Sequence, residues 1–264
     1  QALINTGGLY DLPEVPVVSA INHVINYIPS QKLFLDSTAS TMPYGLLPVF
    51  QAEKPVLLVS HFVDGQKTPS IAQYGHEQIM QTNIHINSDG TATGTTHIGL
   101  KGLPAIDARE VMRNLRGDQE DYAVKKLLES QGVHGTGTIQ KDDPAERLDA
   151  YNLSFSYKLE DLVNVASTIS MPIRPVVYSF LPIATVLSEA YEPTPKKATP
   201  CLGGHSVEEY VYEFPDTQTI VGVPKSYDFT SPALDYKATY IRSGNLLTVK
   251  REIWDKTPSN VCSV

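Results

Sequence analysis

The feature that most constrains the fold is a long alternating stretch, YGHEQIMQTNIHINSDGTATGTTHIGLKG, at residues 74–102. Apolar and polar residues alternate on both sides of Asp89-Gly90, a strong signal for a two-residue turn. The pattern therefore predicts an antiparallel hairpin. A two-residue turn places His85 and His97 on opposite faces of that hairpin, where they cannot share a metal ion.

Strand signals also dominate the rest of the chain. Short runs rich in β-branched and aromatic residues recur between Gly, Pro, Asn and Asp. We expect strands at residues 1–7, 20–28, 32–37, 54–62, 132–140, 149–161, 174–186, 207–215, 233–244 and 245–255. Strands at this spacing predict a sandwich or a strongly curved sheet.

Two consecutive segments are typical of helices. Residues 104–117 begin with Pro104, and residues 118–132 carry an apolar stripe that predicts an amphipathic helix packed on a sheet. The predicted class is therefore α+β and β-dominated. We expect an antiparallel β-sandwich-like region with a short helical insertion near residues 104–131.

The charge and hydropathy of the chain exclude several partners. The formal net charge is −8, so no surplus of Lys and Arg is present to neutralise phosphates. No apolar run approaches the roughly 18 residues that a membrane helix needs. We expect neither nucleic-acid binding nor a membrane span, and no motif predicts a metal ion or another cofactor.

Cys201 and Cys262 are the only cysteines, too few for a disulfide framework or a structural zinc site. They can form one bridge, which would suit an oxidising compartment, or stay as two free thiols. Cys201 also lies four residues before His205, but in a Pro- and Gly-rich connection without a helix start to activate a thiol. A structural reading of that pair is favoured over a catalytic one.

The stretch INHVINYIPSQKLFLDST at residues 21–38 predicts a second hairpin. A loop of two or four residues around PSQ places His23 and Asp36 on one face, and the two-residue register sets them directly opposite each other. A carboxylate in that position fixes the tautomer of the imidazole and leaves its other nitrogen to act on a nucleophile. On spacing alone, a purely structural pair is the commoner outcome.

This region resembles the second half of a transglutaminase-like core, as in bacterial transglutaminase-like proteins with flanking β domains. The resemblance rests on Asn22-His23, Leu35-Asp36-Ser37-Thr38, Tyr44-Gly45 and Leu47-Pro48, which match the order of the family's motifs. It covers residues 1 to about 62. The resemblance implies that residues 1–65 are the C-terminal half of such a core and that residues 66–264 form a β-rich domain.

The family implies a Cys-His-Asp site of a cysteine-dependent acyltransferase or peptidase. His23 would be its general base and acid, Asp36 its orienting partner and Asn22 a supporting residue. No cysteine precedes His23, so the chain alone would be inactive. Because it begins at Gln1 without a signal-peptide pattern and ends abruptly, we expect it to be a fragment of a longer protein.

The expected partners are accordingly the missing N-terminal part of the same protein, a peptide or protein substrate, and further copies of the chain. The resemblance and the disulfide together favour a periplasmic or cell-envelope location. The alternative is a noncatalytic β-sandwich module that binds or interacts with other envelope components, with His23 and Asp36 as an architectural remnant.

Overall fold

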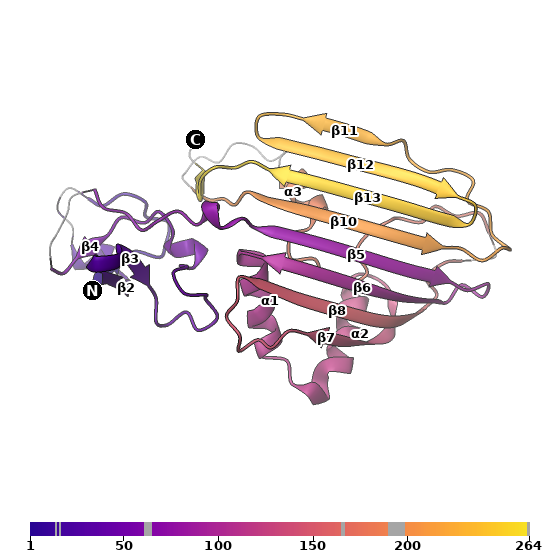
Figure 1. Ribbon diagram of the computed structural model, residues 1–264, viewed down its shortest axis with the longest axis horizontal. Coiled ribbons are helices and arrows are strands. Elements are labelled where there is room, and N and C mark those ends of the chain that lie inside the picture. The colour runs from indigo at the N-terminus through magenta and orange to yellow at the C-terminus, as the bar shows by residue number, and fades with distance from the viewer. Residues whose placement is uncertain (14, 16, 61–64, 165–166, 190–198, 263–264) are drawn as a thin grey trace.

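The computed structural model describes residues 1–13, 15, 17–60, 65–164, 167–189 and 199–262. Its strands form a four-stranded sheet, an eight-stranded sheet and a two-stranded ribbon. The small sheet lies at one end of an elongated molecule and the large sheet fills the other end (Figure 1). The small sheet ends at Leu58 and the large one begins at Glu77, on either side of the predicted boundary at residues 65–66.

The small sheet has the order β3-β2-β1-β4. Its strands are β1 (Ala2–Ile4), β2 (His23–Ile28), β3 (Leu33–Leu35) and β4 (Leu57–Leu58). All four fall inside predicted strands, although the last two residues of the segment 54–62 lie outside the described residues. One face packs on the segment that follows β3, through Ile4, Ile25 and Leu47.

The large sheet has the order β11-β12-β13-β10-β5-β6-β8-β7. Its strands are β5 (Glu77–Ile86), β6 (Ala92–Lys101), β7 (His134–Lys141), β8 (Ala150–Glu160), β10 (Gly204–Glu213), β11 (Tyr227–Thr230), β12 (Leu234–Ser243) and β13 (Leu246–Asp255). Every neighbouring pair is antiparallel except β5 and β10, which are parallel. This parallel pair joins two four-stranded halves.

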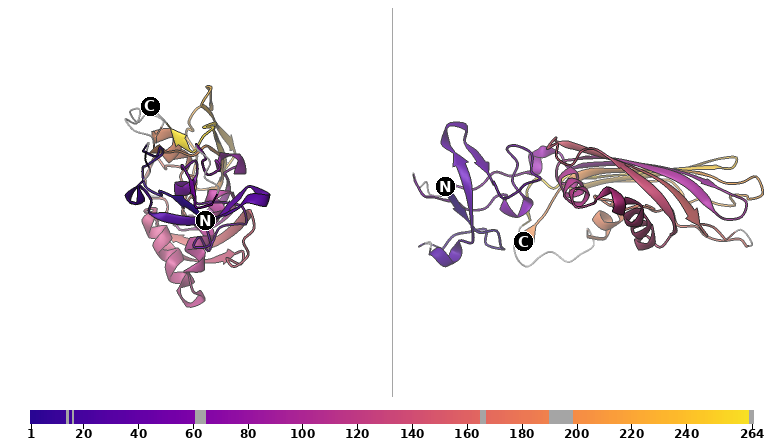
Figure 2. Two further views of the ribbon diagram at one scale, coloured as in Figure 1. Left: turned by 90° about the vertical axis from the view of Figure 1, so that its left-hand side faces the viewer. Right: turned by 90° about the horizontal axis from the view of Figure 1, so that it is seen from below.

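Helices cover one face of the large sheet and leave the other face open (Figure 2). The helices are α1 (Leu103–Arg113), α2 (Glu120–Ser130) and α3 (Ile183–Glu189). The predicted β-dominated α+β class is confirmed, and so is the helical insertion. The sandwich-like arrangement is wrong, because the apolar face is buried by helices and connecting segments rather than by a second sheet.

The alternation of the strands accounts for the main core. In β5, every second residue from Gln78 to Ile86 is buried, and in β8 every second residue from Tyr151 to Leu159. Val124 and Leu128 of α2 pack on this face. Removing one such leucine side chain from water stabilises the fold by about 1.5–3 kcal/mol.

The long hairpin has a different register from the predicted one. Ile86 pairs with Ala92, so the loop has five residues, 87–91, and is closed by Asn87 and Thr91. Asp89 accepts two hydrogen bonds from Thr91, which stabilises this wider turn. The shift of one residue puts His85 and His97 on the same open face, contrary to the prediction.

A strand predicted at residues 174–186 is absent from the described structure. Residues 174–182 are irregular, and α3 follows Pro182, whose carbonyl accepts the first helical hydrogen bonds. Pro175 and Pro182 lack the N–H that a central strand must donate. The apolar residues of this segment instead cover the buried face of the large sheet, where Val176 and Val177 join the core.

A third cluster joins the two sheets. Leu46, Ala52 and Ile71, from the segments around the small sheet, pack against Leu103 and Ile106 of α1. Two guanidinium groups add polar contacts across this junction: Arg109 donates to the carbonyl of Thr41 and Arg113 to the hydroxyl of Ser40. The loop after β3 is therefore attached to a helix of the large sheet.

The C-terminal segment is fixed at the same junction. Strands β9 (Thr199–Pro200) and β14 (Val261–Cys262) pair, and Cys201 and Cys262 form a disulfide with their Cα atoms 5.7 Å apart. The amide oxygen of Asn260 accepts hydrogen bonds from the backbone of Ile71 and Ala72.

We predict that replacing Cys201 and Cys262 together by serine lowers the free energy of unfolding by about 2–4 kcal/mol, because the bridge closes a long loop in the unfolded chain. Urea denaturation followed by circular dichroism measures the difference. The variant is compared with the oxidised wild type, in which the bridge is intact, and with wild type denatured in the presence of reductant, in which the bridge is broken. Equal midpoints for the variant and the oxidised wild type would contradict the prediction.

Candidate functional site

The hairpin of β2 and β3 places His23 and Asp36 on the same face of the small sheet. Ile28 pairs with Leu33, so four residues, Pro29 to Lys32, form the loop. Lys32 closes it in a left-handed conformation with φ of 51°. In this register the two side chains lie diagonally rather than directly opposite, so the predicted face is right and the two-residue register is wrong.

The two side chains are hydrogen-bonded. His23 Nε2 lies 2.9 Å from Asp36 Oδ2, and the side chain of His23 is 25% exposed while that of Asp36 is 2% exposed. An ionised carboxylate only accepts hydrogen bonds, so Nε2 carries the proton. Among the described residues, Nδ1 of His23 has no hydrogen-bond partner, which leaves it available to another group.

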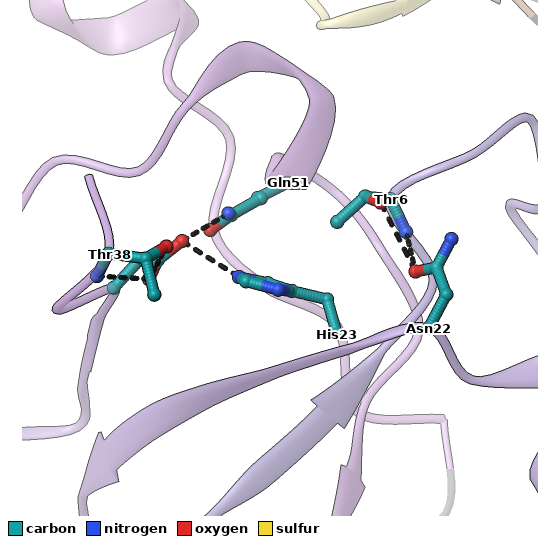
Figure 3. Close-up of polar contacts among 6 residues, drawn as sticks. Thr6, Asn22, His23, Thr38 and Gln51 are labelled. Atoms are coloured by element: carbon teal, nitrogen blue, oxygen red, sulfur yellow. Dashed lines mark hydrogen bonds and ion pairs between the residues drawn. The ribbon is translucent and has the colours of Figure 1, made fainter.

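Two further side chains hold Asp36. Figure 3 shows Gln51 and Thr38 converging with His23 on the same carboxylate. The Gln51 amide donates to Oδ2, and the backbone N–H and hydroxyl of Thr38 donate to Oδ1 at 2.8 and 2.7 Å. Burial alone would raise the pKa of Asp36, but the hydrogen bonds from Gln51, Thr38 and His23 lower it to about 2. Asp36 is therefore a fixed, fully ionised partner at neutral pH.

Asn22 does not take the predicted supporting position. Its amide oxygen accepts hydrogen bonds from the backbone N–H and hydroxyl of Thr6, at 2.8 and 3.1 Å, away from His23 (Figure 3). Asn22 therefore ties the start of β2 to the loop after β1. It orients the strand that carries His23 without contacting the imidazole.

A buried lysine fixes the same loop. Lys54 is 1% exposed, and its ammonium donates to the carbonyls of Gly7 and Leu9 and lies 3.5 Å from the ring centroid of Tyr10. Burial lowers the pKa of Lys54. The carbonyl oxygens and the aromatic face compensate its lost hydration.

No thiol of this chain can serve His23. Both cysteines are joined in the disulfide between β9 and β14, outside the small sheet. Within the described ranges, no group of three or more His, Cys, Asp or Glu side chains could hold a metal ion. His85 and His97 instead bond to Glu213 and Ser154, respectively.

The sequence interpretation missed Gln51 and Thr38. Thr38 had a readable signal, because Asp-x-Thr commonly forms a local turn in which the carboxylate accepts from the residue two positions later. Gln51 had none. It lies in the 3-10 turn Val49–Gln51, and its contact with Asp36 depends on how the loop after β3 folds back.

A separate hollow lies on the large sheet. A shallow trough of about 940 Å³ crosses the open face of the large sheet, between Leu246 at one end and Tyr122 of α2 at the other. Its lining mixes hydroxyl groups, such as those of Thr93 and Ser156, with apolar side chains, such as Val211 and Leu246. It shares no residue with the His23–Asp36 pair.

No protein-family model matches the sequence, and neither a curated protein nor a solved structure was found that resembles it. In the part of the chain that the structure describes, none of the helices has the length and hydropathy needed to cross a membrane. The family resemblance therefore rests on the motifs of residues 1 to about 62 alone.

We predict an acid-sensitive contribution of Asp36 to stability. Its folded-state pKa of about 2 lies below the ordinary value of 3.8, so the contribution is complete above about pH 4 and is lost as the pH falls toward 2. The shift corresponds to about 2 kcal/mol. Urea denaturation between pH 2 and pH 6 should show that Asp36→Asn has a flatter pH dependence than the wild type. Asp216→Asn, an exposed turn residue, controls for the loss of one charge, and an unchanged slope in Asp36→Asn would contradict the assignment.

We also predict the tautomer of the neutral His23 ring, with the proton on Nε2 and none on Nδ1. Two-bond ¹⁵N–¹H correlation spectra distinguish the two nitrogens. In Asp36→Asn the amide can donate as well as accept, so the preference should weaken. A neutral ring protonated on Nδ1 in the wild type would contradict the described hydrogen bond.

Proposed function

We propose that this chain supplies the histidine and aspartate of a transglutaminase-like, cysteine-dependent acyl-transfer or peptidase site. The observation that carries the proposal is an imidazole bound at Nε2 by a buried, ionised carboxylate, with Nδ1 unoccupied among the described residues. That arrangement suits a general base and acid. The motif resemblance over residues 1 to about 62 supports the same reading.

Each side chain has a defined role in the proposed reaction. Nδ1 of His23 takes the proton from a cysteine thiol, and the thiolate attacks the carbonyl carbon of a glutamine side chain or a peptide. His23 then gives that proton to the departing nitrogen, leaving a thioester on the enzyme. In the second half, His23 takes a proton from water or an amine, which attacks the thioester and releases the thiolate. Asp36 stabilises the imidazolium in both halves.

The thiol in this proposal belongs to a segment outside these 264 residues. Both cysteine sulfurs of the chain are joined in its disulfide. The 264-residue chain would therefore hold a preorganised base without its nucleophile. A cell-envelope location agrees with the disulfide, and peptides or proteins are the proposed substrates.

A noncatalytic interaction module is the second candidate. The observation that favours it is the absence of any free thiol among the described residues. In that case Gln51, Thr38 and His23 would simply satisfy a buried carboxylate. The two candidates differ in what precedes Gln1 in the natural gene.

We predict that a longer form of the protein, including the sequence encoded before Gln1, contains a cysteine that reacts with iodoacetamide at neutral pH. His23→Ala should slow this labelling by about 100-fold or more, because the thiol loses its base. Mass spectrometry of the labelled peptide measures the rate and identifies the cysteine.

His97→Ala is the matched control, because it removes a histidine from the open face of the large sheet. It should label at the wild-type rate. Equal labelling in His23→Ala, or no cysteine before Gln1, would refute the catalytic role and leave the interaction module.

A further inference from the structure

The single tryptophan of the chain lies in an unassigned groove at the end of the large sheet nearest the small one. Trp254 is at the end of β13 and is 52% exposed. It lines a hollow of about 520 Å³ together with Tyr74, from the connection between the two sheets, and the Gly203-Gly204 backbone. An aromatic side chain that is exposed and lines a concave site can stack on a ligand, so this groove is a binding candidate.

The indole is held in place from one side. The imidazole of His205 packs against it in a tilted arrangement, with ring centroids 4.7 Å apart and an interplanar angle of 30°. His205 is in turn fixed by two carboxylates: Nε2 is 2.9 Å from Glu252 and Nδ1 is 3.3 Å from Glu77. A ring whose support is locked in this way forms a preorganised stacking platform.

Carboxylates outnumber ammonium groups around the platform, because Glu252 and Asp255 are present besides two ion pairs. Lys101 contacts Glu77 at 3.1 Å and Lys256 contacts Asp235 at 2.7 Å. Burial alone would raise the pKa of Glu77, but hydrogen bonds from Lys101 and His205 lower it. Carboxylates of this kind repel anions and accept hydrogen bonds from hydroxyl groups. A neutral ligand with many hydroxyl groups fits this border of hydrogen-bond acceptors.

We propose that this groove binds carbohydrate, with a sugar ring stacked on the free face of Trp254. The apolar C–H face of a pyranose matches an indole, and its hydroxyls match the carboxylates and ammonium groups at the rim. Among the described residues, the indole N–H has no partner, so it remains available to a hydroxyl. The inference is independent of the proposed acyl transfer, because it uses none of that site's residues.

The test uses Trp254 as its own reporter, since no other tryptophan contributes to the emission. Three neutral trisaccharides serve as probes: the β-1,4-linked N-acetylglucosamine trimer, cellotriose and maltotriose. At least one should shift the emission saturably, with a dissociation constant of about 1 mM or tighter. Tetramethylammonium and a neutral tripeptide, Gly-Ser-Gly, are tested in parallel.

Variants of the groove test whether the sugar binds at Trp254 and His205. Trp254→Ala should abolish binding in ligand-observed saturation-transfer NMR, and His205→Ala should weaken it by about threefold to tenfold. Tyr122→Ala removes an exposed aromatic on α2 outside the groove and should bind like the wild type. Circular dichroism checks the folding of each variant, and Trp254→Phe, which keeps an aromatic face, should retain weakened binding.

Several outcomes would overturn the proposal. These are the absence of binding by all three sugars, full binding by folded Trp254→Ala, or loss of binding only in Tyr122→Ala. Saturable binding of tetramethylammonium or the tripeptide without any sugar would replace carbohydrate by a cationic or peptide ligand.

Discussion

Parallel pairing of β5 with β10 is the interaction on which the large sheet depends. It joins strands 128 residues apart along the chain, with His205 beside Glu77 and Glu213 beside His85. The entropic cost of closing so long a loop is offset by a ladder of nine paired positions. Without it, the two antiparallel halves would each present an unpaired edge. The same pairing builds the Trp254 groove, because it brings Glu77 to the imidazole that supports the indole.

Local patterns predicted much of this fold. Alternation identified nearly every strand of the large sheet, and the apolar stripe of residues 118–132 identified α2. The parallel pairing of β5 with β10 could not be predicted in this way. Local sequence does not specify which distant strand will pair with the edge of a hairpin. The segment 174–186 was misread for a related reason: its apolar residues cover a sheet built by other segments, and its prolines exclude it from the ladder.

The candidate site also combines features that local sequence patterns predict with features that they do not. His23 and Asp36 could be placed on one face from the parity of a short hairpin loop, which depends on neighbouring residues only. The direct opposition was wrong because Lys32 adopts a left-handed conformation and extends the loop. Gln51 could not be foreseen, since its amide reaches Asp36 through the folding of an irregular segment. A shift of one residue in the register of the long hairpin also placed His85 and His97 on the same face of the sheet, where the sequence predicted opposite faces.

The contacts at the junction have a consequence for folding. Strands of two to six residues give the small sheet little stability of its own. Arg109, Arg113 and Asn260, together with the shared apolar cluster, attach it to the larger body. The alignment of imidazole and carboxylate is therefore a property of one cooperative unit that spans both sheets. A peptide cut out around the hairpin would keep the residues and lose their mutual orientation.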